Sequence, residues 1–191
     1  MTRPSICVFC GARSGTDPAH AIAARALGAE IARHRWRLVY GAGDIGLMGE
    51  VARAAQAGGA QALGVIPVHL LGLEQGRREL TTFLITENMH ERKKVMFMNS
   101  DALVVLPGGA GTLDEFFEVV TWAQIGLHRK PIFLLDIGSY WQPLVALVRH
   151  IIASGFAAPS LETLFTVVDD VDVLAASLER ALAATPPEGS A

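Results

Sequence analysis

Short apolar runs bounded by glycine or proline recur along the chain and alternate with longer segments whose apolar residues repeat every three or four positions. The short runs predict β-strands and the longer segments predict α-helices. The predicted strands span residues 6–11, 37–41, 62–67, 82–86, 102–108, 131–136 and 164–168. The predicted helices span residues 18–35, 47–57, 89–99, 112–125, 141–153 and 171–184, with Asp17 and Asp170 as N-caps.

The predicted strands are apolar at successive positions, not at every second one. Continuous apolar strands are typical of a parallel sheet, because helices cover both of its faces. The pattern therefore predicts an α/β fold: a single doubly wound, Rossmann-like domain over residues 1–184 with a mainly parallel sheet of about seven strands. The polar segment 185–191 is predicted to be a disordered tail. Such folds bind ligands beyond the carboxyl ends of the strands.

Composition and charge narrow the classes of function. The 191 residues carry a formal net charge of −3, and the 16 Lys and Arg residues are scattered, so we expect no nucleic-acid partner. No apolar stretch approaches the roughly 18 residues of a membrane span, and no signal-peptide pattern is present, so we expect a cytoplasmic protein without a membrane partner. Cys7 and Cys10 would face opposite sides of a strand, which predicts two buried thiols and not a metal or redox pair.

The first glycine-rich loop places Gly41, Gly43 and Gly46 between a predicted strand and a predicted helix. This G-x-G-x-x-G spacing suits a dinucleotide, but the dinucleotide fingerprint also requires an acidic residue at the end of the next strand. That strand ends at Pro67 without one. A smaller phosphate ligand is therefore favoured over NAD, and a tight turn without ligand contact is an equal alternative.

The second glycine-rich loop, PGGAGT, spans residues 107–112. Glycines let backbone amides turn toward one point, and the following helix adds free N–H groups and the positive end of its dipole, which predicts a phosphate site. Thr112 is expected to cap that helix or to bind the phosphate. No lysine follows the glycines as a Walker A loop requires, which disfavours nucleoside triphosphate chemistry.

Two carboxylates, Asp114 and Glu115, directly follow this loop. The helix dipole should keep a first-turn carboxylate ionised, beside the sugar that carries a bound phosphate. The two side chains point about 100° apart, so at most one is expected to face the ligand. An alternative is that both acids only complement the helix dipole, and the sequence does not decide between the two.

A third polar cluster, ENMHERKK, lies at residues 87–94, where a predicted helix begins. Basic groups at this place can bind a phosphate or polarise a leaving group held at the sheet edge. The alternative is a solvated helix face, which we expect for Glu91 and Lys94. For Arg92 and Lys93 the residues alone favour the same solvated face.

Together these segments resemble the LOG family, the cytokinin riboside 5′-monophosphate phosphoribohydrolases formerly described as lysine decarboxylases. The family motif P-G-G-x-G-T-x-x-E matches residues 107–115 without a gap, and the likeness runs from about residue 5 to residue 170. The resemblance implies hydrolysis of the N-glycosidic bond in AMP or N6-prenyl-AMP, giving the free base and ribose 5-phosphate. It also implies a homodimer with the active site near the subunit interface, and neither metal nor cofactor.

The resemblance also implies roles for residues at matching positions. Glu115 and Arg92 would be the catalytic pair, with Glu115 stabilising an oxocarbenium-like state or aligning water. Arg92 would offset phosphate charge or assist the departing base. Phosphate and nucleotide contacts would come from Gly108, Gly109, Gly111, Thr112, Met89, Lys93, Asp114, Ser14 and Gly43.

Two departures from the family pattern touch the predicted nucleotide crevice. Members often read CGSS where this chain has CGAR at residues 10–13, and GGG where it has GAG at residues 41–43. Ser14 is expected to serve in place of the missing serine. A non-catalytic nucleotide-binding or sensing protein is the alternative function, whereas no lysine has the context of a Schiff-base decarboxylase.

Overall fold

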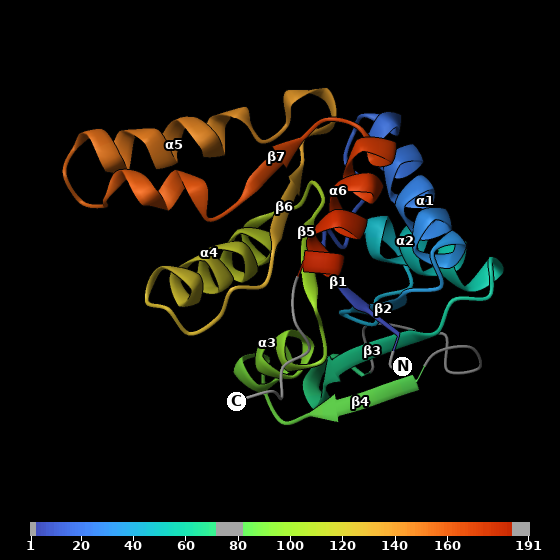
Figure 1. The fold of residues 1–191 in the computed structure, drawn as a ribbon. Coiled ribbons are helices and arrows are strands. Elements are labelled where there is room, and N and C mark those ends of the chain that lie inside the picture. The colour runs from blue at the N-terminus through green and yellow to red at the C-terminus, as the bar shows by residue number, and fades with distance from the viewer. Residues whose placement is uncertain (1–2, 72–81, 185–191) are drawn as a thin grey trace.

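The computed structural model describes residues 3–71 and 82–184. These residues form one sheet of seven strands in the order β4-β3-β2-β1-β5-β6-β7 (Figure 1). The strands are β1 (Ser5–Phe9), β2 (Arg37–Tyr40), β3 (Ala62–Pro67), β4 (Thr82–Thr86), β5 (Ala102–Val105), β6 (Ile132–Leu135) and β7 (Thr166–Val168). Every neighbouring pair is parallel, so the predicted α/β, Rossmann-like fold is confirmed.

Helices cover both faces of the sheet (Figure 1). They are α1 (Pro18–Arg33), α2 (Gly46–Ala57), α3 (Met89–Met98), α4 (Ala110–Gln124), α5 (Gln142–Ala153) and α6 (Val171–Ala184), with short 3-10 turns η1 (Val68–Leu70), η2 (Ile137–Ser139) and η3 (Pro159–Thr163). No helix in the described ranges is long and apolar enough to cross a membrane. The predicted tail at 185–191 lies outside the described residues.

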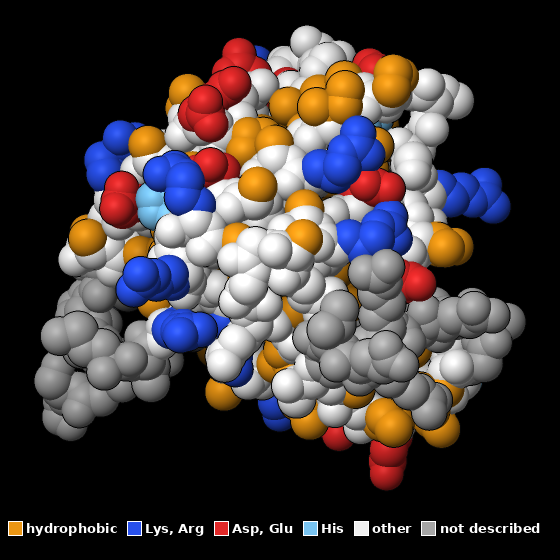
Figure 2. Space-filling view, turned by 90° about the vertical axis from the view of Figure 1, so that its right-hand side faces the viewer, with side chains coloured by type: hydrophobic (Ala, Val, Ile, Leu, Met, Phe, Trp, Pro, Cys, Tyr) orange, Lys and Arg blue, Asp and Glu red, His pale blue; other side chains and the backbone are white. Residues whose placement is uncertain are grey.

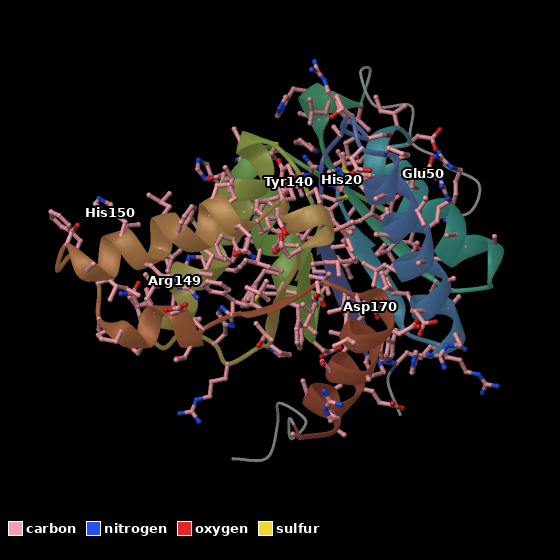
Figure 3. All side chains as sticks on the ribbon, turned by 90° about the horizontal axis from the view of Figure 1, so that it is seen from above. His20, Glu50, Tyr140, Arg149, His150 and Asp170 are labelled. Atoms are coloured by element: carbon pink, nitrogen blue, oxygen red, sulfur yellow. The ribbon has the colours of Figure 1, made fainter. Side chains whose placement is uncertain are left out.

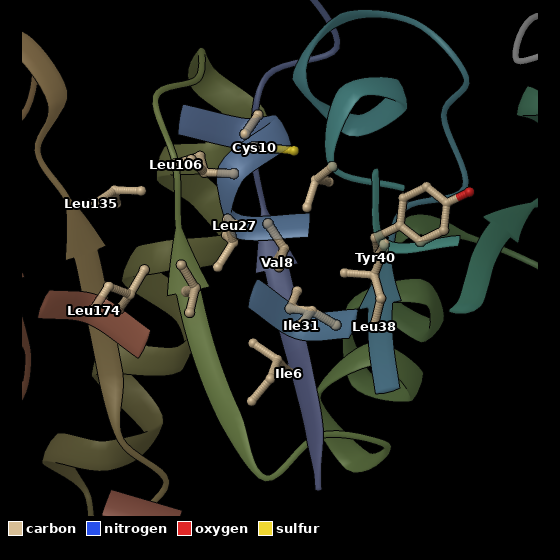
Figure 4. Packing of buried hydrophobic residues seen from close by; sticks show 14 of the residues in the cluster. Ile6, Val8, Cys10, Leu27, Ile31, Leu38, Tyr40, Leu106, Leu135 and Leu174 are labelled. Carbon is tan, nitrogen blue, oxygen red and sulfur yellow. The ribbon is translucent and has the colours of Figure 1, made fainter. Parts of the chain in front are cut away.

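Two hydrophobic clusters form the core, one on each face of the sheet. The first joins the sheet to α1, α2 and α6, and the second joins it to α3, α4 and α5. Along β1, Ile6 and Val8 belong to the first cluster, and Cys7 and Phe9 to the second. Figure 4 shows part of the first cluster, with Val8 beside Leu27 and Ile6 beside Ile31 of α1. Strand residues of both orientations are buried, which explains the continuous apolar runs in the sequence.

Helix ends agree with the sequence prediction to within one residue, except that α1 ends two residues early and α4 starts two residues early. Asp17 accepts a hydrogen bond from the Ala19 amide at 2.8 Å, and Asp170 caps α6, as predicted. Helix α4 begins at Ala110, two residues before the predicted start, and its N-cap is Gly109. Thr112 therefore does not cap the helix. The prediction started the helix after its last glycine, because glycine is an unfavourable helix residue, but tertiary packing overrides that preference.

The carboxyl ends of β1 and β5 mark the point where the strand order reverses. From β1 the successive strands β2, β3 and β4 are added toward one edge of the sheet. From β5 the strands β6 and β7 are added toward the opposite edge. The Gly11 amide donates to the Pro107 carbonyl at 3.0 Å, so the loops after β1 and β5 are in direct contact. This switch point is the place where doubly wound sheets bind ligands.

The outer surface carries charges of both signs. On the face shown in Figure 2, Lys and Arg side chains are spread among Asp, Glu and apolar side chains. They do not form one continuous basic field on this face. A field of that kind is the usual mark of a polyanion-binding surface.

Candidate active site

A cavity of about 720 Å³ lies at the switch point, beyond the carboxyl ends of β1 and β5. Its walls come from the loop after β1, the starts of α1, α2 and α3, the glycine loop after β5 and the segment after β6. The lining residues are Cys10, Gly11, Ala12, Arg13, Ser14, Gly15, Thr16, His20, Leu47, Met48, Met89, Arg92, Pro107, Gly108, Gly109, Gly111, Thr112, Glu115 and Tyr140.

The glycine loop at residues 107–112 forms one wall of this cavity. A Cβ atom placed on Gly108 would overlap the Thr112 side chain, whereas one on Gly109 or Gly111 would meet no heavy atom within 4 Å. Gly108 is thus required by packing, and the other two glycines border open space. No side chain caps the first turn of α4. Its amides and the positive end of the helix dipole make this wall suited to an anion such as a phosphate.

Glu115 lies one turn beyond the glycine loop and lines the cavity. Burial raises the pKa of its carboxyl from the ordinary 4.5 to about 7, although the positive charge of Arg92 partly offsets this rise. The sequence predicted that the helix dipole favours the ionised form, but desolvation of the buried carboxyl acts in the opposite direction and is the larger effect. Near neutral pH the Glu115 carboxyl therefore occurs in both its protonated and its ionised form.

This pKa predicts that Glu115→Gln stabilises the folded protein at pH 8 far more than at pH 5. A carboxyl whose folded pKa exceeds its unfolded pKa contributes its full stability below the unfolded value and loses that contribution as the pH rises through the folded value. The gap between 4.5 and about 7 corresponds to about 3 kcal/mol of unfolding free energy at pH 8, and to less than about 1 kcal/mol at pH 5.

Urea unfolding of both proteins at the two pH values measures this difference. Glu87→Gln, at an exposed position before α3, is the matched control and should change stability equally at both pH values. An equal effect of Glu115→Gln at pH 5 and pH 8 would contradict a desolvated carboxyl at this position.

Arg92 is buried on α3, with 6% of its surface exposed. Its guanidinium donates to the Val65 carbonyl at 3.1 Å and to the Gly41 carbonyl at 2.6 Å, and contacts the Met89 sulfur at 3.7 Å. A side chain at Gly41 would overlap this guanidinium. The alternative of a solvated helix face is therefore wrong for Arg92. The main-chain carbonyls of Val65 within β3 and of Gly41 directly after β2 hold its positive charge at the cavity wall.

Three residues that the sequence connects with the nucleotide lie outside the cavity wall. Lys93 places its Nζ 2.9 Å from Asp114 and 3.1 Å from Glu118, and so links α3 to α4. A Cβ atom on Gly43 would meet the flexible end of the Met48 side chain, so this glycine borders that methionine and not the cavity. Of the two adjacent acids after the glycine loop, only Glu115 lines the cavity, as their angular separation predicts.

The other predicted site residues come together. The cavity wall contains Ser14, Met89, Arg92, Gly108, Gly109, Gly111, Thr112 and Glu115. They arise from three segments that are far apart in the sequence and meet at one edge of the sheet.

The sequence prediction missed Tyr140, His20 and Thr16, and noted Arg13 only as a departure from the family pattern. All four line the cavity. Figure 3 shows Tyr140 next to His20, and their ring centroids are 5.4 Å apart. The position of Tyr140 just after β6 was an available signal, because strand ends near the switch point supply ligand contacts. His20 carries no such signal, since it belongs to the first turn of α1.

The family departure at residues 41–43 has a local structural consequence. Ala42 has φ 63°, in the left-handed region that favours glycine, and it is fully buried. A non-glycine residue in this region costs about 1–2 kcal/mol. The turn that precedes α2 thus keeps a conformation suited to the glycine of the family pattern.

The cysteines and the acidic residues do not form a metal or redox centre in the described ranges. Cys7 and Cys10 are both free and buried, and they belong to clusters on opposite faces of the sheet, as predicted. Burial raises the pKa of both thiols, which keeps them in the unreactive protonated form. Across residues 3–71 and 82–184, no three His, Cys, Asp or Glu side chains gather in a metal-binding arrangement.

Comparison with known proteins identifies the family. A family model described as "Possible lysine decarboxylase" matches residues 48–178. A protein of Oryza sativa subsp. japonica named probable cytokinin riboside 5′-monophosphate phosphoribohydrolase LOGL9 is 45% identical over 175 residues, covering 92% of this chain and 77% of that protein. The cytokinin riboside 5′-monophosphate phosphoribohydrolase of Rhodococcoides fascians is 40% identical, covering 90% of this chain and 87% of its own.

Solved structures agree on the fold. The molybdenum cofactor carrier protein of Chlamydomonas reinhardtii superimposes with a TM-score of 0.74 at 24% identity, covering 95% of this chain and 99% of its own. At this identity the likeness establishes the shared fold alone. The family match over more than half of the chain, together with the identity to the named relatives, shows that this protein belongs to the LOG family of cytokinin riboside 5′-monophosphate phosphoribohydrolases.

Proposed function

We propose that this protein hydrolyses the N-glycosidic bond of AMP or of an N6-substituted AMP, releasing the free base and ribose 5-phosphate. Its curated relatives are named for this reaction on cytokinin riboside 5′-monophosphates. The observation that carries the proposal is that Glu115 and the open glycine loop share one cavity wall. One helical turn, about 5.4 Å, separates them, a distance that a single phosphorylated sugar can bridge.

The reaction breaks the bond between C1′ of the ribose and the base nitrogen. The bonding electron pair leaves with the base, a water oxygen attaches to C1′, and the proton lost by the water balances the proton gained by the base. Positive charge develops on the ribose in the transition state, so Glu115 in its ionised form stabilises it or orients the water. The guanidinium of Arg92 stabilises the negative charge that develops on the departing base.

The two ends of the cavity differ in chemistry. The glycine loop and Thr112 would bind the 5′-phosphate through main-chain amides and a hydroxyl, with Ser14 on the facing loop. Met48 and Met89 line the end near Arg92, where flexible thioether side chains would contact the base. Lys93, Asp114 and Gly43 would act indirectly. The first two join α3 to α4, and the glycine leaves room for the Met48 side chain, which lines the cavity.

We expect Gly111→Ala to weaken nucleotide binding without weakening the fold. The new methyl group meets no protein atom within 4 Å, and alanine is favoured over glycine in a helix by about 1 kcal/mol. The same methyl group would occupy space beside the phosphate, so the KM for AMP should rise about ten-fold or more.

Steady-state kinetics and urea unfolding test both parts of this expectation. Gly108→Ala is the contrasting variant, because its methyl group would overlap Thr112 and should lower stability. An unchanged KM in Gly111→Ala would show that the phosphate binds elsewhere.

The proposed reaction is tested by incubating the purified protein with AMP and with N6-isopentenyl-AMP. Chromatography should detect free base and ribose 5-phosphate in equal amounts, and the two rates identify the preferred substrate. If AMP raises the melting temperature but no base is released, the protein is a non-catalytic nucleotide-binding or sensing protein.

The proposal includes a cytoplasmic homodimer whose active site lies near the subunit interface. Helix α5 starts beside the cavity residue Tyr140 and exposes Leu147, and Phe156 follows the helix with 86% of its surface exposed. Apolar side chains of this kind are typical of surfaces that a partner covers. Light scattering that gave the mass of a monomer would overturn the dimer.

A further inference from the structure

The segment after β6 reaches across the cavity to the glycine loop. The Tyr140 hydroxyl donates a hydrogen bond to the Gly108 carbonyl at 2.6 Å, and the tyrosine side chain also lines the cavity. We propose that Tyr140 is a positioning residue that holds the glycine loop in its phosphate-binding conformation. This inference rests on the proposed function, because it concerns the phosphate end of the same site.

Two consecutive peptide groups of the glycine loop are anchored by different segments. The Gly11 amide donates to the Pro107 carbonyl at 3.0 Å, and the Tyr140 hydroxyl donates to the next carbonyl, that of Gly108. A trans peptide group is planar, so fixing a carbonyl also fixes the N–H of the following residue, which points the opposite way. The two anchors therefore set the directions of the Gly108 and Gly109 amides, which border the cavity.

The glycine loop needs such anchors because its cavity-facing part at Gly109 lacks side-chain contacts. Gly109 carries no side chain, borders open space and receives no side-chain cap at the start of α4. Glycine backbones have the greatest conformational freedom, and ordering them on ligand binding lowers affinity. A hydrogen bond made before the ligand arrives removes part of that cost.

The backbone before Tyr140 has an unusual conformation. Gly138 and Ser139 both have positive φ angles, of 63° and 60°. A non-glycine residue such as Ser139 is strained in this region, and such strain persists only where surrounding contacts fix the backbone. The buried Asp136 side chain supplies one such contact, because it accepts the Trp141 amide at 2.5 Å. The turn is thus held on both sides of Tyr140.

The ring of Tyr140 is also held in place. His20 of α1 is buried and meets the ring edge to face at 5.4 Å between centroids, and Trp141 does so at 4.8 Å. Figure 3 shows His20 and Tyr140 side by side between α1 and the segment after β6. Aromatic contacts of this geometry restrict the ring, so the hydroxyl has a defined direction toward Gly108.

The test uses Tyr140→Phe, which removes only the hydroxyl group. Calorimetric titration with AMP and with ribose 5-phosphate should give Kd values about five- to ten-fold higher than in the wild type, the effect of one neutral hydrogen bond. The KM for AMP should rise in parallel, with kcat within about two-fold, because a positioning role affects binding more than chemistry. Thr163→Val is the matched control, since it removes a hydroxyl-to-carbonyl bond of 2.8 Å in an exposed turn.

Several outcomes would overturn the inference. They are unchanged Kd values, a loss of affinity for AMP without a loss of affinity for ribose 5-phosphate, and a fall in kcat at constant Kd. Melting temperatures check that the variant is folded. Tyr140→Leu, which also removes the ring, must weaken the binding of ribose 5-phosphate at least as much as Tyr140→Phe does. The binding results do not depend on hydrolysis. A wild-type protein that binds both ligands but releases no base would overturn the proposed function alone, and one that binds neither would overturn both.

Discussion

Glu115→Gln is expected to remove most of the hydrolysis of AMP while leaving AMP binding nearly intact. Glutamine keeps the shape of the side chain but cannot carry the negative charge that faces the ribosyl cation. It also cannot accept a proton from the attacking water. Removal of one such electrostatic contact lowers turnover by about 10³-fold. Release of adenine measured by chromatography gives kcat, and calorimetric titration gives the Kd for AMP.

Glu118→Gln is the matched control for this result. Glu118 lies about one turn further along α4, where it contacts Lys93 and is absent from the cavity wall. This variant should keep kcat within about three-fold of the wild type. A kcat of Glu115→Gln equal to that of the wild type would refute the catalytic assignment. A loss of AMP binding together with the loss of turnover would assign Glu115 to binding.

Arg92→Lys is expected to lower both activity and stability. The guanidinium donates at once to two carbonyls from different segments, that of Val65 in β3 and that of Gly41 after β2. A lysine ammonium keeps the charge but lacks the planar fork that reaches both, so one buried carbonyl loses its partner. The free energy of unfolding should fall by about 1–3 kcal/mol. The kcat/KM should fall about 10²-fold, because the charge no longer has a fixed position beside the base.

Kinetics at a temperature well below the melting temperature separates these two effects. Lys94→Met is the control, because Lys94 follows Arg92 closely in the sequence but is exposed on α3. It should change neither quantity. Arg92→Lys with wild-type kcat/KM and lowered stability would limit Arg92 to a structural role.

Features that depend on local sequence were predictable. The apolar runs and their spacing predicted the parallel sheet, because a strand buried on both faces must be apolar at successive positions. The glycine loop and Glu115 were also predictable, because a strand, a glycine turn and a helix start are adjacent in the chain and fix their own relative geometry. The α4 boundary was less predictable, since packing decides whether Gly111 joins the helix.

Features that depend on distant segments required the tertiary structure. The pKa of Glu115 follows from burial and from the charge of Arg92 on another helix, neither of which is visible in the residues around it. The ion pair of Lys93 with Asp114 turns both away from the cavity, although the sequence connects them with the ligand. Tyr140 reaches the glycine loop because β6 pairs with β5.

The residues alone were enough to predict the fold class, the family, the glycine loop and the acidic residue beside it. The raised pKa of that acid, the position of Lys93 and Asp114 outside the cavity wall and the contact of Tyr140 with the loop came from the folded molecule. The difference arises because backbone conformation responds mainly to neighbours in the chain. Desolvation and through-space contacts respond to neighbours in space, and strand order sets those neighbours.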